Sequence, residues 1–312
     1  MNGSPGVRLV KVDSDRAGQR LDNFLLGQLK GAPRSLIYRI LRTGQVRVNG
    51  KRAKPDTRLE GGEEIRIPPV RLAEAGDPGQ ASPAMLQRIE RAILLEDRDL
   101  LVLDKPSGIA SHGGSGISFG AIELMRQLRP GQTLELVHRL DRDTSGILLL
   151  AKRRSALSQL QKLMREGGIE KRYLALLAGE VRKPRFSVDA PLEKSVLQGG
   201  ERMVRVDAAG KESLSHFSLI ERLGDFSYVE VKIDTGRTHQ IRVHAAYAGF
   251  SVAGDEKYGD KSANQQAKKA GLKRLFLHAA RLEFALDEGD RPYVINAPLP
   301  VELKAVMDKL AG

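Results

Sequence analysis

The chain has 312 residues and a formal net charge of +12, with 51 Lys and Arg against 39 Asp and Glu. It contains no cysteine, which excludes disulfide bonds, a thiolate nucleophile and cysteine-ligated metal. No run of about 20 apolar residues is present and the first residues lack the apolar core of a signal peptide, so we expect a cytoplasmic protein without a membrane span. The basic excess favours a polyanionic partner, because each neutralised phosphate releases counterions.

The basic residues are concentrated near the N-terminus. Residues 1–71 carry 15 Lys and Arg against 7 Asp and Glu, which is +8 of the total +12. Hydrophobic residues make up 41% of the chain, enough for the cores of a small and a large domain. We predict an N-terminal extension at 1–17, a small basic domain at 18–71, a linker at 72–84 and a large domain at 85–312.

The small domain is predicted to contain two short helices and a small sheet. A helix is expected from Ala32 to Arg42, because Pro33 and Gly44 stand where helix ends prefer them. Its apolar arc comprises Leu36, Ile37, Ile40 and Leu41. Asn49-Gly50 indicates a type I′ turn in a basic hairpin over 46–54, and a strand is expected at 64–67.

The helix and hairpin of the small domain would together present one basic surface. A charge run is often only a solvated face, but a basic helix beside a basic hairpin favours contact with an RNA backbone. The predicted RNA-binding residues are Arg34, Tyr38, Arg39, Arg42, Arg47, Lys51, Arg52 and Lys54.

The stretch between the domains, residues 73–84, is rich in Gly, Pro and Ala and is predicted to be a flexible tether. A hairpin is expected over 92–104, ending at Lys105. The glycine-rich segment 108–116 precedes a helix expected at 119–128. Its backbone N–H groups would suit a phosphate, but no Gly-Lys-Ser/Thr sequence is present, so a flexible active-site rim fits better.

The segment most suggestive of chemistry is 137–152, VHRLDRDTSGILLLAK. Asp141 stands at the head of a polar loop between Arg139 and Arg142, and the loop leads into an apolar strand. An acid placed in this way can remain ionised. The alternative is an ordinary turn in which the side chain caps its own backbone.

Further segments are expected to converge on the Asp141 loop. They are strands at 171–176, 228–233 and 275–280 and a helix at 239–248. Tyr173 would project from the first strand, and Arg242 from a helix whose N-cap is Thr238. An arginine close to Asp141 would favour its charged form, and the set describes a pocket for a flat, partly apolar ring such as uracil.

No metal or cofactor is predicted. His239 and His244 are five residues apart, which does not place them on one helix face, and no Glu accompanies them as in zinc hydrolases.

Two sets of motifs resemble known families. RLDNFL, SLIYRILRTGQVRVNGKRAKP and LEGGEEIRI resemble the S4 RNA-binding domain, and HRLDRDTSGILLLAK, KRYLAL, TGRTHQIRVH and LFLHAARLEF resemble, in order, the motifs of pseudouridine synthases that carry such a domain. The resemblance implies an α+β fold, with a mixed, mainly antiparallel sheet flanked by helices and loops beside a small α/β domain. It also implies isomerisation of uridine to pseudouridine in RNA, with 23S ribosomal RNA as the expected partner.

The resemblance also implies residue roles. Asp141 would be the catalytic aspartate, Tyr173 would stack on the target base and Arg242 would pair with Asp141. Substrate-binding roles would belong to Arg139, which helps displace the nucleotide, to Thr144, and to Leu277, which lines the pocket. Three routes stay open for the carboxylate: addition to the sugar, addition to the base, or removal of a sugar proton.

Two other functions stay open from the residues alone. The first is a non-catalytic RNA-binding or ribosome-assembly protein, and the second is a hydrolase that uses Asp141 with Asp143 as a second carboxylate. We expect a monomer, a polar loop and hairpin at 198–211, a basic surface insertion at 260–273 and a closing helix at 300–310.

Overall fold

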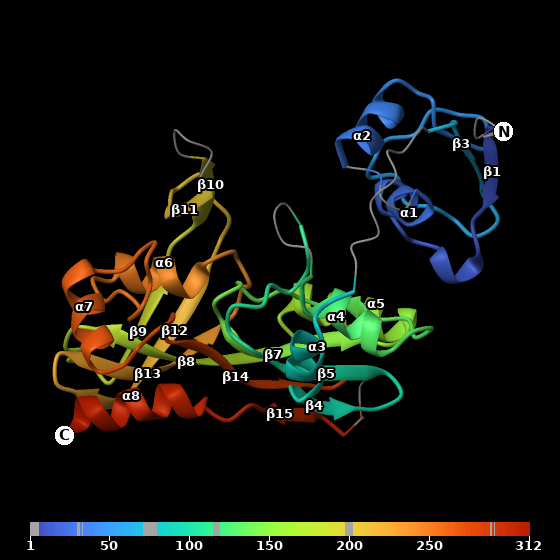
Figure 1. Cartoon of the computed structure of the whole chain (residues 1–312). Coiled ribbons are helices and arrows are strands. Elements are labelled where there is room, and N and C mark those ends of the chain that lie inside the picture. The colour runs from blue at the N-terminus through green and yellow to red at the C-terminus, as the bar shows by residue number, and fades with distance from the viewer. Residues whose placement is uncertain are drawn as a thin grey trace. The chain divides into compact units, whose positions relative to one another are not determined.

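A computed structural model describes residues 6–29, 32, 34–70, 80–114, 119–196, 202–287, 289 and 291–312. The chain forms two compact units, Met1–Gly79 and Gln80–Gly312 (Figure 1). In the described ranges, no helix has both the length and the apolarity that crossing a bilayer requires.

The first unit contains the two predicted helices and a three-stranded antiparallel sheet. Its elements are β1 (Arg8–Lys11), the short 3-10 helix Ser14–Arg16, α1 (Leu21–Gln28), α2 (Arg34–Arg42), β2 (Arg47–Val48) and β3 (Glu64–Ile67), with sheet order β1-β3-β2. The predicted apolar arc of α2 is confirmed, since Ile37, Ile40 and Leu41 are buried in the core of this unit.

Two details of the first unit differ from expectation. Residues 8–11 were assigned to an extension, but they pair with β3 along their whole length. Asn49 and Gly50 have φ of 48° and 76°, as a type I′ turn requires, yet the returning chain forms only a single bridge, from Lys51 to Val48. Pro55, four residues after Lys51, lacks an N–H and limits how far a returning strand could extend.

The end of the predicted linker is helical. Helix α3 spans Pro83–Glu90, and the hydroxyl of Ser82 caps it by accepting the N–H of Met85 at 3.3 Å. Ala81 is buried, and its N–H donates to the side chain of Gln127 at 3.0 Å. The tether prediction is therefore wrong for residues 81–84, where Ser-Pro is a helix start. Residues 71–79 lie outside the described ranges.

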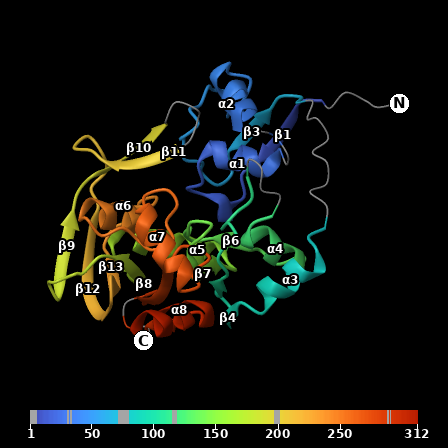
Figure 2. The same cartoon turned by 60° about the vertical axis from the view of Figure 1, so that its left-hand side comes forward.

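The second unit is built on one large sheet with helices on both faces (Figures 1 and 2). The strand order is β4-β5-β7-β14-β8-β13-β12-β9, with β6 pairing β7 and β15 pairing β14. Among the strand pairs of the described ranges, only β7 and β14 run parallel, which confirms the predicted mixed, mainly antiparallel sheet. The strands are β4 (Ile93–Glu96), β5 (Leu100–Lys105), β6 (Glu135–Leu136), β7 (Ser145–Ala151), β8 (Glu170–Ala178), β9 (Arg185–Asp189), β12 (Leu214–Leu223), β13 (Phe226–Ile233), β14 (Leu277–Phe284) and β15 (Tyr293–Asn296).

Helices and one separate hairpin complete the second unit. They are α4 (Ala121–Leu128), α5 (Arg154–Glu166), α6 (Gln240–Tyr247), α7 (Lys261–Lys269) and α8 (Val301–Ala311), and the hairpin pairs β10 (Leu192–Val196) with β11 (Arg202–Val206). Alternate residues of β7 pack on opposite faces of the sheet: Leu148 and Leu150 face the cluster that includes α4 and α6, while Ile147 and Leu149 face α5.

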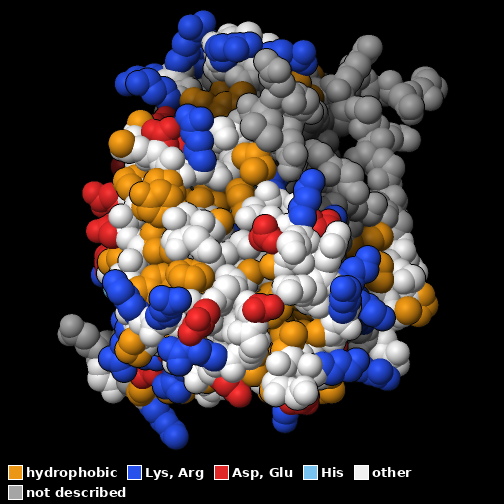
Figure 3. Space-filling view, turned by 90° about the vertical axis from the view of Figure 1, so that its left-hand side faces the viewer, with side chains coloured by type: hydrophobic (Ala, Val, Ile, Leu, Met, Phe, Trp, Pro, Cys, Tyr) orange, Lys and Arg blue, Asp and Glu red, His pale blue; other side chains and the backbone are white. Residues whose placement is uncertain are grey.

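Several element predictions are confirmed with shifted bounds. The hairpin expected over 92–104 is β4 and β5, and the closing helix is α8. Helix α4 begins at Ala121 rather than at 119, and β14 begins at Leu277 rather than at 275 and continues to Phe284. The expected basic insertion contains α7, whose lysines are exposed. Figure 3 shows that Lys and Arg side chains on the face turned to the viewer are interspersed with apolar and acidic ones. The hairpin expected at 198–211 is displaced, because β10 lies before that range and only β11 lies within it, and residues 197–201 lie outside the described ranges.

Gly146 provides a test of the contact between β7 and β14. Its φ is 109°, and a Cβ at this position would overlap the backbone carbonyl of Ala279. We expect Gly146→Ala to destabilise the protein by roughly 3 kcal/mol or more, since neither backbone can move without breaking sheet hydrogen bonds. Gly131→Ala is the matched control, because Gly131 has φ of 83° but open space around it, and should cost only about 1 kcal/mol. Urea unfolding of both variants checks this, and equal losses would contradict the steric argument.

Candidate functional site

Asp141 lies in a tight turn that leads into β7. The N–H of Thr144 donates to the carbonyl of Asp141 at 3.2 Å and closes the turn. The preceding residue, Leu140, is buried, whereas the Asp141 side chain keeps 25% of its surface exposed. The turn therefore holds its backbone firmly while leaving the carboxylate accessible.

The segment after β5 holds the Asp141 turn in place. The buried ammonium of Lys105 donates to the carbonyls of Pro106, Ile109 and Arg142 at 3.1, 2.6 and 3.1 Å. Burial lowers the pKa of Lys105 to about 7, against the opposing charges of Asp143 and Asp141.

Three serine and glycine contacts complete this support. The hydroxyl of Ser107 donates to the carbonyl of Asp143, and the N–H of Gly108 donates to the carbonyl of Arg142. The hydroxyl of Ser111 donates to the carbonyl of Leu140 and accepts the N–H of the same residue. The expectation of a flexible rim does not fit residues 108–111, whose donors and acceptors tie them to the turn. Residues 115–118 lie outside the described ranges.

Arg242 on α6 contacts Asp141 as predicted, but its strongest partner is Asp255. Its Nη1 lies 3.4 Å from Oδ2 of Asp141, while its Nε and Nη2 donate to the two oxygens of Asp255 at 2.7 and 2.8 Å. Burial would raise the pKa of Asp255, but the hydrogen bonds and charge of Arg242 lower it below the ordinary value. The Arg242–Asp255 pair is buried and has the two-point geometry of a strong ion pair.

Helix α6 begins differently from the prediction. Its N-cap is His239, with φ of 55°, and not Thr238. The side chain of Gln240 accepts both the N–H of Arg237 and the hydroxyl of Thr235, so a threonine cap is not needed here. Nε2 of His239 lies 3.8 Å from Oδ2 of Asp141, and Nδ1 lies 2.8 Å from the hydroxyl of Tyr258.

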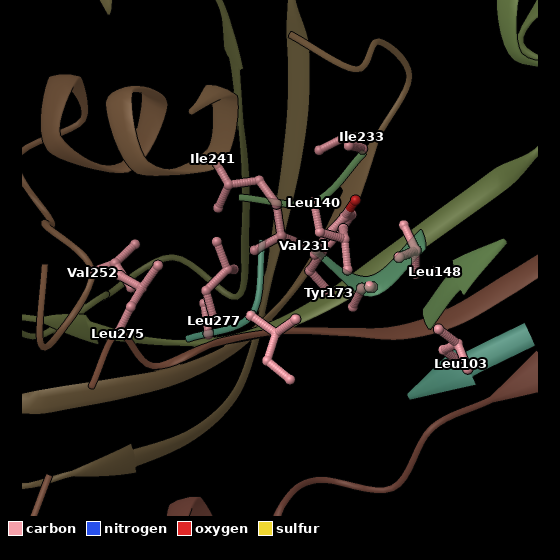
Figure 4. Packing of buried hydrophobic residues seen from close by; sticks show 14 of the residues in the cluster. Leu103, Leu140, Leu148, Tyr173, Val231, Ile233, Ile241, Val252, Leu275 and Leu277 are labelled. Carbon is pink, nitrogen blue, oxygen red and sulfur yellow. The ribbon is translucent and has the colours of Figure 1, made fainter. Parts of the chain in front are cut away.

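An apolar cluster adjoins the Asp141 turn. Tyr173 on β8 and Leu277 on β14 are both buried in it, together with Leu140 and Ile241 (Figure 4). Burial raises the pKa of Tyr173, and the negative charge of Asp141 adds to the effect, so its hydroxyl stays neutral. Tyr173 thus suits a stacking or packing role rather than that of a base.

The other predicted residues of the turn have different surroundings. Arg139 is exposed, as a residue that reaches into RNA would be. Thr144 is 3% exposed, and its backbone closes the turn, which is a structural role. A substrate contact from either residue stays a prediction.

The predicted basic surface of the first unit is largely exposed. Among its members Tyr38, Arg39, Arg42, Lys51, Arg52 and Lys54 are exposed, Arg47 is half-buried, and the side chain of Arg34 is not among those described. The hydroxyl of Tyr38 donates to Asp22 at 3.0 Å.

The histidines of α6 do not form a metal site with each other. His244 is fully buried, and its two ring nitrogens lie 2.9 Å from the hydroxyl of Ser215 and 3.0 Å from the carbonyl of Ala190. In the part of the chain that the structure describes, no group of three or more metal-ligating side chains comes together.

Sequence reasoning missed Asp255 and Tyr258 and considered His239 only as a metal ligand. Asp255 follows Gly254 in a polar turn, which is a common place for an acid and gives no sign of a partner. The sequence offers one indirect signal: Arg242 stands on a helix with several apolar residues, and a buried arginine needs more counter-charge than one partly exposed acid supplies.

Both units of the chain resemble known proteins. A family profile described as RNA pseudouridylate synthase matches residues 99–247, and one described as S4 domain matches residues 19–65. The chain is 52% identical to ribosomal large subunit pseudouridine synthase C of Salmonella typhi and to that of Escherichia coli (strain K12), over 98% of each chain. Among solved structures, human RNA pseudouridylate synthase domain containing 1 has a TM-score of 0.58 and 27% identity, covering 70% of this chain and 86% of that one.

The Arg242–Asp255 pair predicts a specific cost for removing one charge. Asp255→Asn should destabilise the protein by roughly 3–5 kcal/mol, because it leaves a buried guanidinium without its counter-charge. Asp143→Asn, which breaks an exposed pair with Arg142, should cost less than about 1 kcal/mol. Urea unfolding at neutral pH distinguishes the two, and a small effect at Asp255 would contradict the inferred role.

The same pair predicts a pH dependence. The pKa of Asp255 is lower in the folded protein than in the unfolded chain, where it is about 4. Its contribution to the free energy of unfolding is therefore fully present above that unfolded pKa and is lost as pH falls through the folded-state pKa. The stability gap between the wild type and Asp255→Asn should therefore stay constant from pH 7 to about pH 5 and narrow only in more acidic solution. A gap that closes near pH 6 would assign the effect to another group.

Proposed function

Because the chain belongs to the RNA pseudouridylate synthase family, we propose that Asp141 is the carboxylate with which it isomerises uridine to pseudouridine. The observation that carries this proposal is the position of Asp141. Its carboxylate is accessible, lies 3.4 Å from a buried guanidinium, and adjoins an apolar cluster that contains Tyr173. A pyrimidine ring placed on that cluster would lie beside the acid.

The reaction breaks the bond between C1′ of the ribose and N1 of uracil and forms a bond from C1′ to C5. N1 gains a proton and C5 loses one, so no group is imported and nothing is oxidised. The target nucleotide must leave the RNA stack, which costs a few kcal/mol. We assign Arg139 to displacing the nucleotide, Tyr173 to stacking on the base and Leu277 to lining the pocket.

The proposed substrate is RNA of the large ribosomal subunit, with 23S ribosomal RNA as the specific expectation. The relatives at 52% identity are named for that subunit, and the matched S4 domain carries the exposed basic surface described above. We further propose that the chain works as a monomer in the cytoplasm. The proposed RNA substrate would be found in that compartment.

Replacing the proposed catalytic acid gives the direct test. Asp141→Asn and Asp141→Ala should abolish pseudouridine formation while RNA affinity changes by less than about threefold, because the carboxylate acts on the base and not on the backbone. Asp143→Asn, two residues away, should retain most of the activity. Both are measured on ribosomal RNA transcripts by chemical mapping of pseudouridine.

Three outcomes, from this mapping, from product analysis and from genetic complementation, would count against the proposal. Residual pseudouridine formation by Asp141→Ala would remove Asp141 from the chemistry. Release of free uracil by the wild type would favour a hydrolase. Full complementation of a gene deletion by Asp141→Ala would favour a non-catalytic assembly protein.

The basic surface of the first unit is tested through salt dependence. Removing Arg39 and Arg42 together should weaken RNA binding and reduce the slope of log K against log salt concentration by about 1–2, since up to two phosphate contacts are lost. Lys11→Ala on β1 is the matched control for simple loss of positive charge in the same unit. Filter binding at several salt concentrations measures both, and identical slopes for all proteins would exclude α2 from the interface.

A further inference from the structure

His239 has an unusual backbone conformation. Among the described residues, only His239 and Asn49 combine a side chain with positive φ, and Asn49 belongs to a hairpin turn where asparagine is favoured. Positive φ is uncommon for residues other than glycine, although histidine adopts it more often than most, and residues held in such conformations cluster at functional sites. The backbone places the imidazole between Asp141 and Tyr258.

Both ring nitrogens of His239 face a defined neighbour. Nδ1 lies 2.8 Å from the hydroxyl of Tyr258, and Nε2 lies 3.8 Å from Oδ2 of Asp141. The hydroxyl of Tyr258 also accepts the N–H of Val204 on β11 at 3.0 Å. The ring of Tyr258 meets the imidazole edge-on and lies against the guanidinium of Arg242, which restricts its movement.

These contacts select one tautomer of the imidazole. Burial lowers the pKa of His239, with the charge of Asp141 opposing, so the ring is neutral and carries a single N–H. A lone pair on Nε2 would be repelled by the carboxylate of Asp141, so the proton belongs on Nε2. Nδ1 then accepts the hydroxyl proton of Tyr258, whose oxygen is left to accept from Val204.

The charges around the ring agree with this assignment. The charged groups that face it are Asp141 from the turn, Arg242 from α6, and Asp255 and Lys257 from the following loop. Arg242 and Lys257 disfavour a second proton on the ring, whereas the acids favour one. The acid nearest to Nε2 is Asp141, and its Oδ2 is also the atom that Nη1 of Arg242 approaches.

We propose that His239 is a positioning residue for the reaction: its Nε2–H donates to Oδ2 of Asp141 and, with Nη1 of Arg242, orients the carboxylate for the base. This rests on the proposed role of Asp141. The present 3.8 Å separation is longer than a hydrogen bond, and catalytic contacts of this kind often shorten only when substrate is bound. Tyr258 and Val204 have the supporting task of keeping the proton on Nε2.

Two substitutions separate this role from a purely structural one. His239→Asn tolerates positive φ and keeps a polar group near the place of Nδ1, but it has no donor at the place of Nε2. His239→Gln tolerates that backbone less well, yet its amide reaches the place of Nε2. If His239 had a purely structural role, His239→Asn should retain more activity than His239→Gln. If His239 positions Asp141, His239→Gln should retain more.

We expect His239→Asn to lower kcat by about tenfold or more, the effect of losing a hydrogen bond to a charged group, while KM for RNA changes by less than about threefold. His239→Gln should retain kcat within about threefold of the wild type. Asn performing as well as Gln, or losses confined to KM, would overturn the proposal. Activity in Asp141→Asn would instead defeat the proposed function, so the two failures are distinguishable.

A second variant keeps the test decisive if the His239 substitutions do not fold. Tyr258→Phe removes the hydroxyl that fixes the tautomer and should lower kcat several-fold with little change in KM. Where His239→Asn does fold, Tyr258→Phe in that background should cause no further loss of kcat, because the two residues act on the same proton. An unchanged kcat in Tyr258→Phe, or fully additive losses in the double variant, would overturn the proposed arrangement.

Discussion

The site depends on the two-point ion pair between Arg242 and Asp255. A guanidinium bound through Nε and Nη2 has its plane fixed, so the direction of its remaining Nη1 is also fixed. Without Asp255, the buried arginine would need the whole carboxylate of Asp141 as its counter-charge. Because Asp255 supplies that charge, Asp141 is restrained by one longer contact and its carboxylate remains available to a substrate.

The sheet explains how residues so distant in sequence meet. Asp141 and Arg242 are 101 positions apart, and Tyr173 lies between them in the chain. The Asp141 turn leads into β7, which pairs in parallel with β14, the strand that carries Leu277. Strand β14 pairs in turn with β8, which carries Tyr173. The turn itself is fixed from the other side by Lys105 at the end of β5, so support for the acid comes from strands on both sides of β7.

The sequence predicts the parts of this arrangement that depend on local patterns. The alternating run of β13, the apolar run of β7 and the apolar arc of α2 each follow from the burial of a strand or helix face, and the family motifs identify Asp141, Tyr173 and Arg242 together. What the sequence does not predict depends on long-range partners. Nothing local shows that Gln240 makes a threonine cap unnecessary, or that the glycine-rich segment after β5 is bonded to the Asp141 turn.

Asp255 illustrates this limit most clearly. As a residue in a polar turn it looks like a solvent-exposed acid, yet it is almost completely buried by the guanidinium that it neutralises and by the N–H groups of Lys257 and Tyr258. A pattern of residue types describes what each position prefers, whereas this acid is defined by its partner. The motifs therefore indicate the proposed reactive group, whereas the residues that support it were found only in three dimensions.

The exposure of Asp141 has a consequence for how the site excludes water. The apolar residues beside it are buried, but the protein leaves a quarter of the Asp141 side chain open to solvent. A flat pyrimidine lying on the cluster around Tyr173 would cover that opening and strengthen the contacts from Arg242 and His239 by lowering the local dielectric constant. The protein would then provide the apolar surface under the base and the fixed charges, and the extruded base itself would exclude water. Asp141 would become fully desolvated only when a target nucleotide is bound.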